Sequence, residues 1–267
     1  MQSLSAIFLS YTNSKEIHQM NLDCIDSLLK SEKFDDTFPL QIIFIESNKN
    51  YFEQNYHLPD NVEVIVPNEE FNFHRFLNIG IDKSNYNFIA LCNNDLLFHK
   101  HWFTEILAIS EQHSNILSYS PAALNEQWKG DYKLGYHIRS HIKGWCIVVK
   151  KELFKHIGKL DEAFDFYYAD DDYGMTLKKH KLKHAVVSKS IVNHLGGVNT
   201  ETSKNEGNKH FALITNKYPN LPKYLYTEGY NWILKNEKLL DGHLKFHQKW
   251  GSPRWIAFRE RLRRLFN

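Results

Sequence analysis

Short apolar runs alternate with helix-like segments in the first 114 residues, and this alternation constrains the fold more than any other feature. The runs are rich in Ile, Leu, Val and Phe, close on polar residues, and span 4–11, 40–47, 61–68 and 87–95. Such runs are typical of strands that are buried on both faces of a sheet. Helix-like segments span 16–31, 74–84 and 100–114. Strands and helices in this alternation predict an α/β fold, with a mostly parallel sheet flanked by helices.

Polar residues stand where three of these strands end. The carboxyl ends of parallel strands meet at one edge of a sheet, and ligands bind beyond that edge. The sequence therefore predicts a ligand site there, and the candidate residues are Tyr11, Thr12, Glu46, Asn93, Asn94 and Asp95.

Composition narrows the class of protein. Of the 267 residues, 42% are hydrophobic and 24% are charged, which is typical of a globular chain and excludes a disordered one. The formal net charge of +2 does not favour a nucleic-acid partner. No window approaches 18 apolar residues, the N-terminus lacks the basic start of a signal peptide, and the three cysteines lack metal-ligand spacing. We therefore expect a soluble, cytoplasmic protein with reduced thiols.

Asp95 and His194 are candidate metal ligands. Asp95 follows a strand beside two asparagines, and its carboxylate is a hard ligand that suits Mg²⁺ or Mn²⁺. Asn and Asp also form turns without binding metal, and on local sequence alone that interpretation is the more frequent one. A single histidine is likewise more often structural than a ligand. His194 would add to a manganese site only if it meets Asp95 in space.

Three consecutive aspartates, Asp170–Asp172, follow an aromatic stretch. If a helix begins here, Asp170 could cap it, and the three carboxylates diverge because successive residues turn by about 100°. In an extended turn, Asp170 and Asp172 share one side and Asp171 faces away. A solvated cluster at a helix start is the plain structural interpretation. Phe166 and two tyrosines argue against it, because they would surround the acids with apolar surface.

Two later segments differ in composition from the rest of the chain. Residues 196–209 are rich in Gly, Asn, Thr and Lys without apolar periodicity, which predicts a loop and a mobile lid. As a helix, residues 254–267 would put Trp255 and Phe258 on one side, with arginines around the rest. Such a helix either lies on an anionic membrane surface or docks on the core with a solvated basic face. Both interpretations stay open.

Taken in order, these motifs resemble the inverting nucleotide-sugar glycosyltransferases of family 2, which have a GT-A fold. The resemblance covers roughly residues 4–197. It implies that Asp95 ends the family's D-x-D motif and holds a metal that bridges the diphosphate, with Asn93 in place of the first acid. Residues 157–175 are similar to the motif G-G-F-D-E-x-F-F-x-Y-x-E-D-x-D-L, with Ala169 replacing its glutamate. Asp170 is then the catalytic base, and Asp172 its support or fallback.

The same resemblance implies the other site residues. His194, Gly196 and Gly197 match an H-x-G-G-like end, whose histidine completes the metal site. Gly144 and Trp145 lie where relatives shape the acceptor pocket, although a core tryptophan is an equal interpretation. Glu46 replaces the aspartate that holds uracil, and Arg75 lies near the family's basic position. The implied nucleotide-sugar-binding residues are Tyr11, Thr12, Glu46, Arg75, Asn78, Gly80, Asn93, Asn94 and Asp95.

The resemblance also implies a domain plan and an activity. Residues 1–215 would form the GT-A domain, with a nucleotide-binding half (1–98) and an acceptor and catalytic half (99–215); residues 216–267 would form a helical, basic amphipathic extension. The implied reaction moves a sugar, by default from a UDP-sugar and with Mn²⁺ or Mg²⁺, to a hydroxyl of a glycan or lipid-linked acceptor. Bacterial surface polysaccharide or lipopolysaccharide synthesis fits this reaction. Residues 254–267 would contact the inner face of the cytoplasmic membrane.

Two alternatives remain at this point. A GT-A-like nucleotidyltransferase would also need a metal-binding acid after a strand. It usually carries a Gly-rich basic loop near the N-terminus, however, and residues 8–16 lack one. The departures at Asn93 and Ala169 also leave open a non-catalytic protein of the same fold that binds sugar or a membrane surface.

Overall fold

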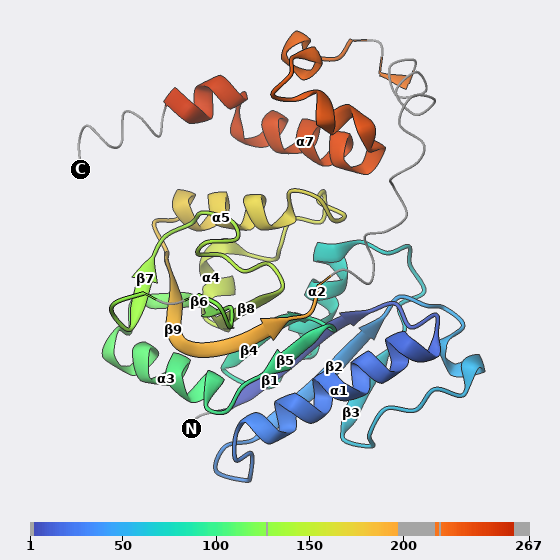
Figure 1. Ribbon diagram of the computed structural model, residues 1–267, viewed down its shortest axis with the longest axis vertical. Helices are drawn as coiled ribbons and strands as arrows, with labels where there is room; N and C mark the ends of the chain where they lie inside the picture. Colours follow the sequence, from blue (N-terminus) through green and yellow to red (C-terminus); the bar gives the residue numbers. More distant parts are fainter. Residues whose placement is uncertain (1–2, 127, 197–216, 219, 259–267) are drawn as a thin grey trace.

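The first half of the chain forms the parallel half of the sheet. The computed structural model describes residues 3–126, 128–196, 217–218 and 220–258. Its first strands are β1 (Leu4–Ser10), β2 (Leu40–Glu46), β3 (Val62–Ile65) and β4 (Phe88–Asn93). They lie in the order β3-β2-β1-β4, and each neighbouring pair is parallel (Figure 1). The helices between them are α1 (Lys15–Ser31), the 3-10 helix η1 (Tyr51–Gln54) and α2 (Phe73–Lys83).

The second half of the chain extends the same sheet with mixed strand directions. β8 (Cys146–Lys150) lies antiparallel to β4 and to β6 (Ile116–Ala122), whereas β9 (Lys183–His194) is parallel to β6. The short strands β5 (Leu96–Phe98) and β7 (Tyr132–Leu134) are antiparallel to β9. The helices here are α3 (Trp102–Gln112), α4 (Leu153–Ile157) and α5 (Ala169–Lys179). The result is one nine-stranded sheet in which β4 joins the two halves.

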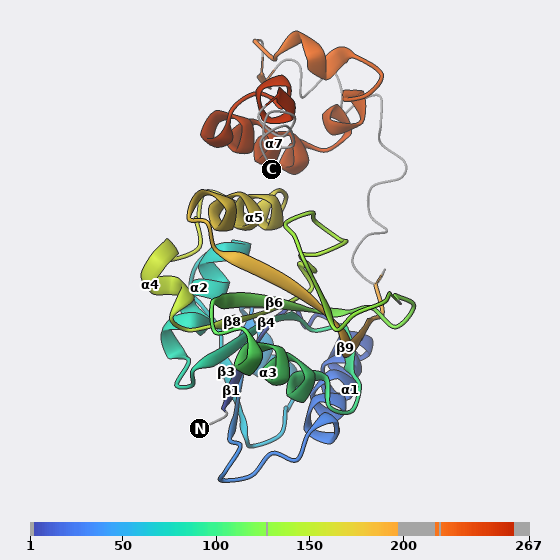
Figure 2. The ribbon, with the colours of Figure 1, turned by 90° about the vertical axis from the view of Figure 1, so that its left-hand side faces the viewer.

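Helices cover both faces of this sheet, and β1 shows why. Its residues Leu4, Ala6 and Phe8 pack with α1 and α3, whereas Ile7 and Leu9 pack with α2, α4 and α5. All seven residues of β1 are buried, as expected for a strand packed on both faces. Figure 2 shows the helical layers on opposite sides of the sheet. The predicted fold class, an α/β sheet flanked by helices, is confirmed.

The sequence interpretation missed three strands: β5, β6 and β7. β6 carries Ser118, Ser120 and Pro121 among apolar residues, so its sequence suggests a polar loop. All seven of its residues are nevertheless buried, and the Ser118 hydroxyl hydrogen-bonds with Tyr173 and His184. The apolar runs 144–150 and 184–190 also predict strands, which correspond to β8 and β9; β9 is longer than predicted and extends through His194. That extension brings His194 opposite β5, directly after the end of β4.

Beyond the sheet, the elements that the structure describes are helical. They include the 3-10 helices η3 (Lys223–Tyr226) and η4 (Asn231–Lys235), the helix α7 (Glu237–Trp250) and helical residues 253–258. α7 packs on the outer side of α5 (Figures 1 and 2). The predicted boundary at 215–216, the predicted lid beyond Gly196 and the tail from residue 259 lie outside the described residues. Within the described ranges, no helix is long and apolar enough to cross a membrane.

Candidate active site

Asp95 and His194 lie side by side because β5 pairs with the end of β9. Leu96, the residue after Asp95, is opposite His194 in this antiparallel ladder. The backbone N–H of Leu195 donates to the carbonyl of Asp95 at 3.0 Å. The side chains meet as well, with 3.2 Å between His194 Nε2 and Asp95 Oδ2. Two residues that are 99 positions apart in the sequence therefore form one carboxylate–imidazole pair.

The donor set of this pair fits a divalent ion. Asp95 is 15% exposed, and its second oxygen, Oδ1, is buried with no hydrogen-bond partner among the described residues. A hard oxygen ligand beside an imidazole suits Mn²⁺, and Mg²⁺ is commonly held by one or two carboxylates plus waters and substrate phosphates. In the part of the chain that the structure describes, no cluster of three or more ligand side chains could hold a metal alone.

Trp145 stacks on the metal-ligand candidate His194. The two ring centroids are 5.5 Å apart and the planes differ by 13°. Trp145 is also tied to the end of β4, because its carbonyl accepts a hydrogen bond from the backbone N–H of Asn93 at 2.9 Å. The tryptophan is partly buried and packs against the hydrophobic core. Its contact with the imidazole fixes the plane in which His194 can present Nε2.

Asp170 lies in the first turn of α5 and packs against Gly144. The helix is capped by Tyr168, which has a left-handed backbone (φ 65°), so the expectation that Asp170 caps the helix is wrong. A Cβ atom added to Gly144 would lie 1.9 Å from Asp170 Oδ2, which shows how closely the carboxylate approaches the backbone of residue 144. Phe73, His74 and Tyr173 line the same small pocket. Burial, and then the charge of Asp171, raises the pKa of Asp170 to about 6.

Asp172 points in another direction. The extended-turn geometry, in which Asp170 and Asp172 share a side, is wrong because the segment is helical and the two residues are about 200° apart. The Asp172 side chain is 3% exposed; its Oδ1 lies 2.7 Å from Lys249 Nζ and accepts a hydrogen bond from Trp250 Nε1 at 2.7 Å. Asp171 is partly buried, and burial raises its pKa although the charge of Arg139 opposes the rise.

These contacts form one continuous arrangement at the carboxyl edge of β4. Asp170 packs on Gly144, Gly144 precedes Trp145, Trp145 stacks on His194, and His194 contacts Asp95. The arrangement joins residues of β9, α5, the loop before β8 and the turn after β4. A carboxylate with a raised pKa therefore lies near a candidate metal pair, separated from it by two adjacent residues, Gly144 and Trp145.

Residues predicted at the end of β1 and β2 are mostly engaged with each other. Glu46 is 1% exposed, and its carboxylate accepts hydrogen bonds from the backbone and hydroxyl of Thr12 and from the backbone of Asn48. Asn94 is also buried and donates to Asn21 at 2.7 Å. These side chains order the turns that follow the strands. Tyr11, which is 54% exposed, is the residue of this group that presents a large surface outward. Asn93 at the end of β4 is partly exposed.

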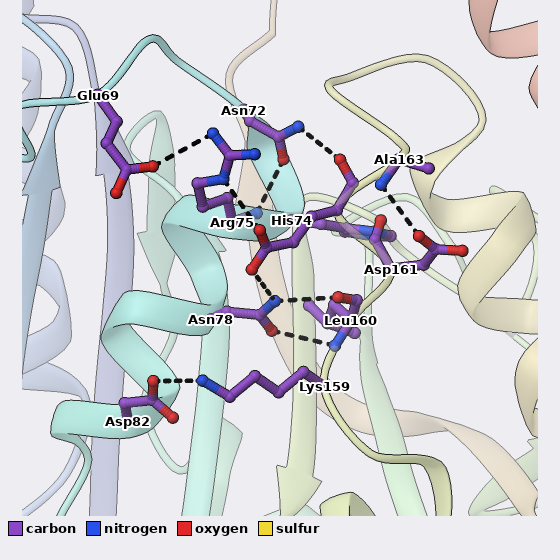
Figure 3. A network of polar contacts seen from close by, with 11 residues as sticks. Glu69, Asn72, His74, Arg75, Asn78, Asp82, Lys159, Leu160, Asp161 and Ala163 are labelled. Carbon is purple, nitrogen blue, oxygen red and sulfur yellow. Dashed lines mark hydrogen bonds and ion pairs between the residues drawn. The ribbon is translucent and has the colours of Figure 1, made fainter.

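The predicted residues of α2 bind the segment that leads to α5. Asn78 donates to the carbonyl of Leu160 and accepts from its N–H, at 2.9 and 3.0 Å (Figure 3). Arg75 donates to Glu162 at 2.9 Å and lies 3.2 Å from Glu69. A Cβ atom at Gly80 would lie 2.4 Å from Ile7, so this glycine permits the helix to pack closely on β1. In this structure the three residues make internal contacts.

Sequence reasoning missed the partners of Asp172. Lys249 and Trp250 follow it by 77 and 78 residues in a segment without a recognisable motif. Local sequence patterns contain no signal for such a contact. Lys245 and Lys249 lie on one side of α7, and lysines at this spacing could pair with acidic residues in many parts of the chain.

Comparison with known proteins shows a similarity in fold. No protein-family model matches the chain, and no curated protein matches it. It is similar to the crystal structure of S. aureus TarS, a glycosyltransferase with a GT-A fold, with a TM-score of 0.53 and 14% identity. The chain has a GT-A-like fold. The match covers 72% of this chain but only 36% of TarS, so the chain corresponds to about a third of that protein.

Within a GT-A-like fold, the arrangement from Asp170 to Asp95 occupies the edge where ligands are expected. Parallel α/β sheets bind ligands beyond the carboxyl ends of their strands. β1 and β4 end at this edge, with Tyr11 after one strand and Asp95 after the other. Geometry and fold therefore indicate the same region of the molecule.

Proposed function

We propose that this chain is an inverting glycosyltransferase, which moves a sugar from a nucleoside-diphosphate sugar to a hydroxyl of a glycan or glycolipid. The observation that carries the proposal is the continuous contact from Asp170 through Gly144 and Trp145 to the His194–Asp95 pair. A partly buried carboxylate and a carboxylate–imidazole pair lie at the same edge of a GT-A-like sheet, where they would act as base and metal ligands. The similarity to TarS supports the fold in which this chemistry would occur.

The donor would bind along the ends of β1 and β4. Tyr11 and Asn93 are exposed enough to contact the nucleotide directly. Thr12, Glu46 and Asn94 would shape the turns beneath it, and Arg75, Asn78 and Gly80 would hold the neighbouring wall. Asp95 and His194 would hold a divalent ion, Mn²⁺ or Mg²⁺, which supplies Lewis-acid stabilisation of negative charge. The Oδ1 atom of Asp95, which has no hydrogen-bond partner among the described residues, supports this assignment.

Asp170 would accept the proton of the attacking hydroxyl. Its pKa of about 6 leaves it ionised at neutral pH yet basic enough to take a proton, as general-base catalysis requires. The acceptor oxygen forms the new bond to the anomeric carbon while the bond to the diphosphate oxygen breaks on the opposite face. The proton goes to Asp170, and the anomeric configuration inverts without a covalent enzyme intermediate.

A UDP-sugar is the donor we propose, with dTDP-rhamnose as the second choice, and the acceptor would belong to a bacterial surface polysaccharide or lipopolysaccharide. We also propose a domain of residues 1–215 followed by a membrane-associated extension. Trp255 and Phe258 support the extension's role, because both are about half exposed and stack at 5.8 Å. Such aromatic residues suit an interfacial helix.

The deciding experiment is a screen of nucleotide sugars with and without Mn²⁺, measuring release of the nucleoside diphosphate. We expect release from one donor class, faster with Mn²⁺ and lost on chelation or in Asp95→Asn. Turnover that is indifferent to metal would refute the metal site. Donor binding without turnover, with every acceptor offered, would instead favour the non-catalytic alternative.

A further inference from the structure

α7 contacts the segment that carries the proposed base through a single face. Lys245 lies 3.1 Å from Asp165, and Lys249 lies 2.6 Å from Asp161 and 2.7 Å from Asp172. Lysines four residues apart lie on the same side of a helix. Three acids of the segment 161–172 are therefore paired with one face of a helix that lies about 80 residues further along the chain.

Apolar and neutral contacts complete this interface. Phe246 packs with Phe164 and Ala169, and its ring centroid lies 5.3 Å from that of Tyr168. The Tyr168 hydroxyl hydrogen-bonds with His243 Nδ1 at 2.7 Å. α7 thus contacts the residue that caps α5, in addition to the acids.

Asp172 is the most enclosed of the acids in this interface. Its side chain is 3% exposed, compared with 36% for Asp161 and 48% for Asp165. A buried carboxylate is costly unless it is paired and hydrogen-bonded. Lys249 and Trp250 supply both, and the hydrogen bonds of Lys249 to Asp161 and Asp172 raise its pKa although burial opposes this. The contact is therefore a strong constraint on where Asp172 can lie.

Fixing Asp172 also fixes the direction of Asp170. The two residues are about 200° apart around the α5 axis, so one faces α7 when the other faces Gly144. The next residue, Tyr173, is held on the sheet side by a 2.6 Å hydrogen bond to Ser118. Rotation of α5 is restrained from both sides.

We propose that Lys249 and Trp250 are positioning residues for the base: by binding Asp172 they set the rotation of α5 that keeps Asp170 against Gly144. This inference rests on the proposed function, because it takes Asp170 as the base. Asp172 then holds α5 in place and is not the alternative base that the family resemblance implies. The C-terminal segment then contributes to catalysis without touching the substrate.

The test compares three variants of α7 for kcat, donor KM and hydrogen exchange of the α5 amides. Trp250→Phe removes one N–H donor to Asp172 and keeps an aromatic ring; Lys249→Met removes the charge and keeps the stem. Lys245→Met is the matched control, since it also removes a lysine that pairs with two acids, Asp165 and Asp241, neither of which lies in α5. We expect kcat to fall on the order of 10- to 100-fold in the first two, with donor KM little changed, because the base and not the donor site is displaced. Lys249→Arg should restore most of the loss.

The outcomes separate this inference from the proposed function. If Trp250→Phe and Lys249→Met keep the wild-type kcat, or if Lys245→Met loses as much, the positioning role is refuted. If Lys249→Met does not fold, Trp250→Phe alone decides, because it deletes a single hydrogen bond. If the wild type transfers no sugar, the proposed function fails. Hydrogen exchange then still tests whether α7 restrains α5. The α5 amides should exchange faster in Trp250→Phe than in the wild type, and at the wild-type rate in Lys245→Met.

Discussion

Replacing Gly144 with alanine tests whether Asp170 acts from the position that the structure gives it. The added Cβ would lie 1.9 Å from Asp170 Oδ2 and 2.3 Å from Cγ, whereas ordinary contact begins at 3.4 Å. The carboxylate and residue 144 must therefore separate by about 1.5 Å, a distance set by the same contacts. Misplacement of a catalytic group by about 1 Å can cost on the order of 100-fold in rate. We expect kcat to fall by about that factor, equivalent to about 2.7 kcal/mol of transition-state stabilisation.

The assay is the initial rate of nucleoside-diphosphate release at saturating donor, with nucleotide affinity measured separately by calorimetry. Gly229→Ala is the matched control, because a Cβ there meets nothing within 4 Å. Gly144→Ala should bind nucleotide normally and remain folded, since the crowding affects one carboxylate. A Gly144→Ala enzyme with kcat within about twofold of wild type would refute the assignment of Asp170 as the base in this position.

Three further predictions concern the base, the metal pair and the tail. Asp170→Asn should reduce transfer by about 100-fold or more while nucleotide binding survives. Because burial raises the pKa of Asp170 to about 6, its ionised form costs stability above that pH, and the cost disappears as pH falls toward the ordinary value near 3.8. Asp170→Asn should thus melt at a higher temperature than wild type at neutral pH, with no gain near pH 4; an equal gain at both would contradict this. Trp145→Leu should weaken Mn²⁺ binding to the donor-free protein by about 10-fold, measured by titration calorimetry, since the stacked ring orients His194; unchanged affinity would leave the stacking without that role. Deletion of residues 254–267 should keep activity on a soluble acceptor but reduce co-sedimentation with anionic vesicles, and unchanged sedimentation would assign the tail to ordinary packing.

The fold was predictable where apolar residues are contiguous. β1, β2 and β4 consist of side chains that can be buried on both faces, so their sequences predict central parallel strands. β6 was missed because its polar residues are satisfied by distant partners: Ser118 by His184 and Tyr173, and Ser120 by the backbone of Lys143. Local sequence contains no information about those bonds. Buried polar strands of this kind can be recognised only after the strands beside them are known.

The candidate site was predictable to the extent that it depends on strand ends. Asp95 and His194 were paired by hypothesis, and the antiparallel ladder of β5 with β9 supplies the contact, although β5 itself was not expected. The internal contacts of Glu46 were not predictable, because a longer acid at that position can turn back to Thr12 as easily as it can face a ligand. The direction of a side chain in a loop depends on which other loop lies beside it. The sequence alone does not show which loops are neighbours.

The run of three aspartates shows most clearly what helical geometry adds to a motif. Adjacent like charges repel, and one helical turn separates them by sending each toward a different environment. Asp172 meets a lysine and an indole N–H, and Asp171 lies within the influence of Arg139. Asp170 lines a pocket whose other walls are mostly apolar side chains, together with His74 and Tyr173. Among the described side chains, none supplies a compensating cation to Asp170, and burial raises its pKa to about 6, a property that suits the proposed general base. In the proposed mechanism, the pairing of Asp172 would serve Asp170 by orienting the helix that carries both residues.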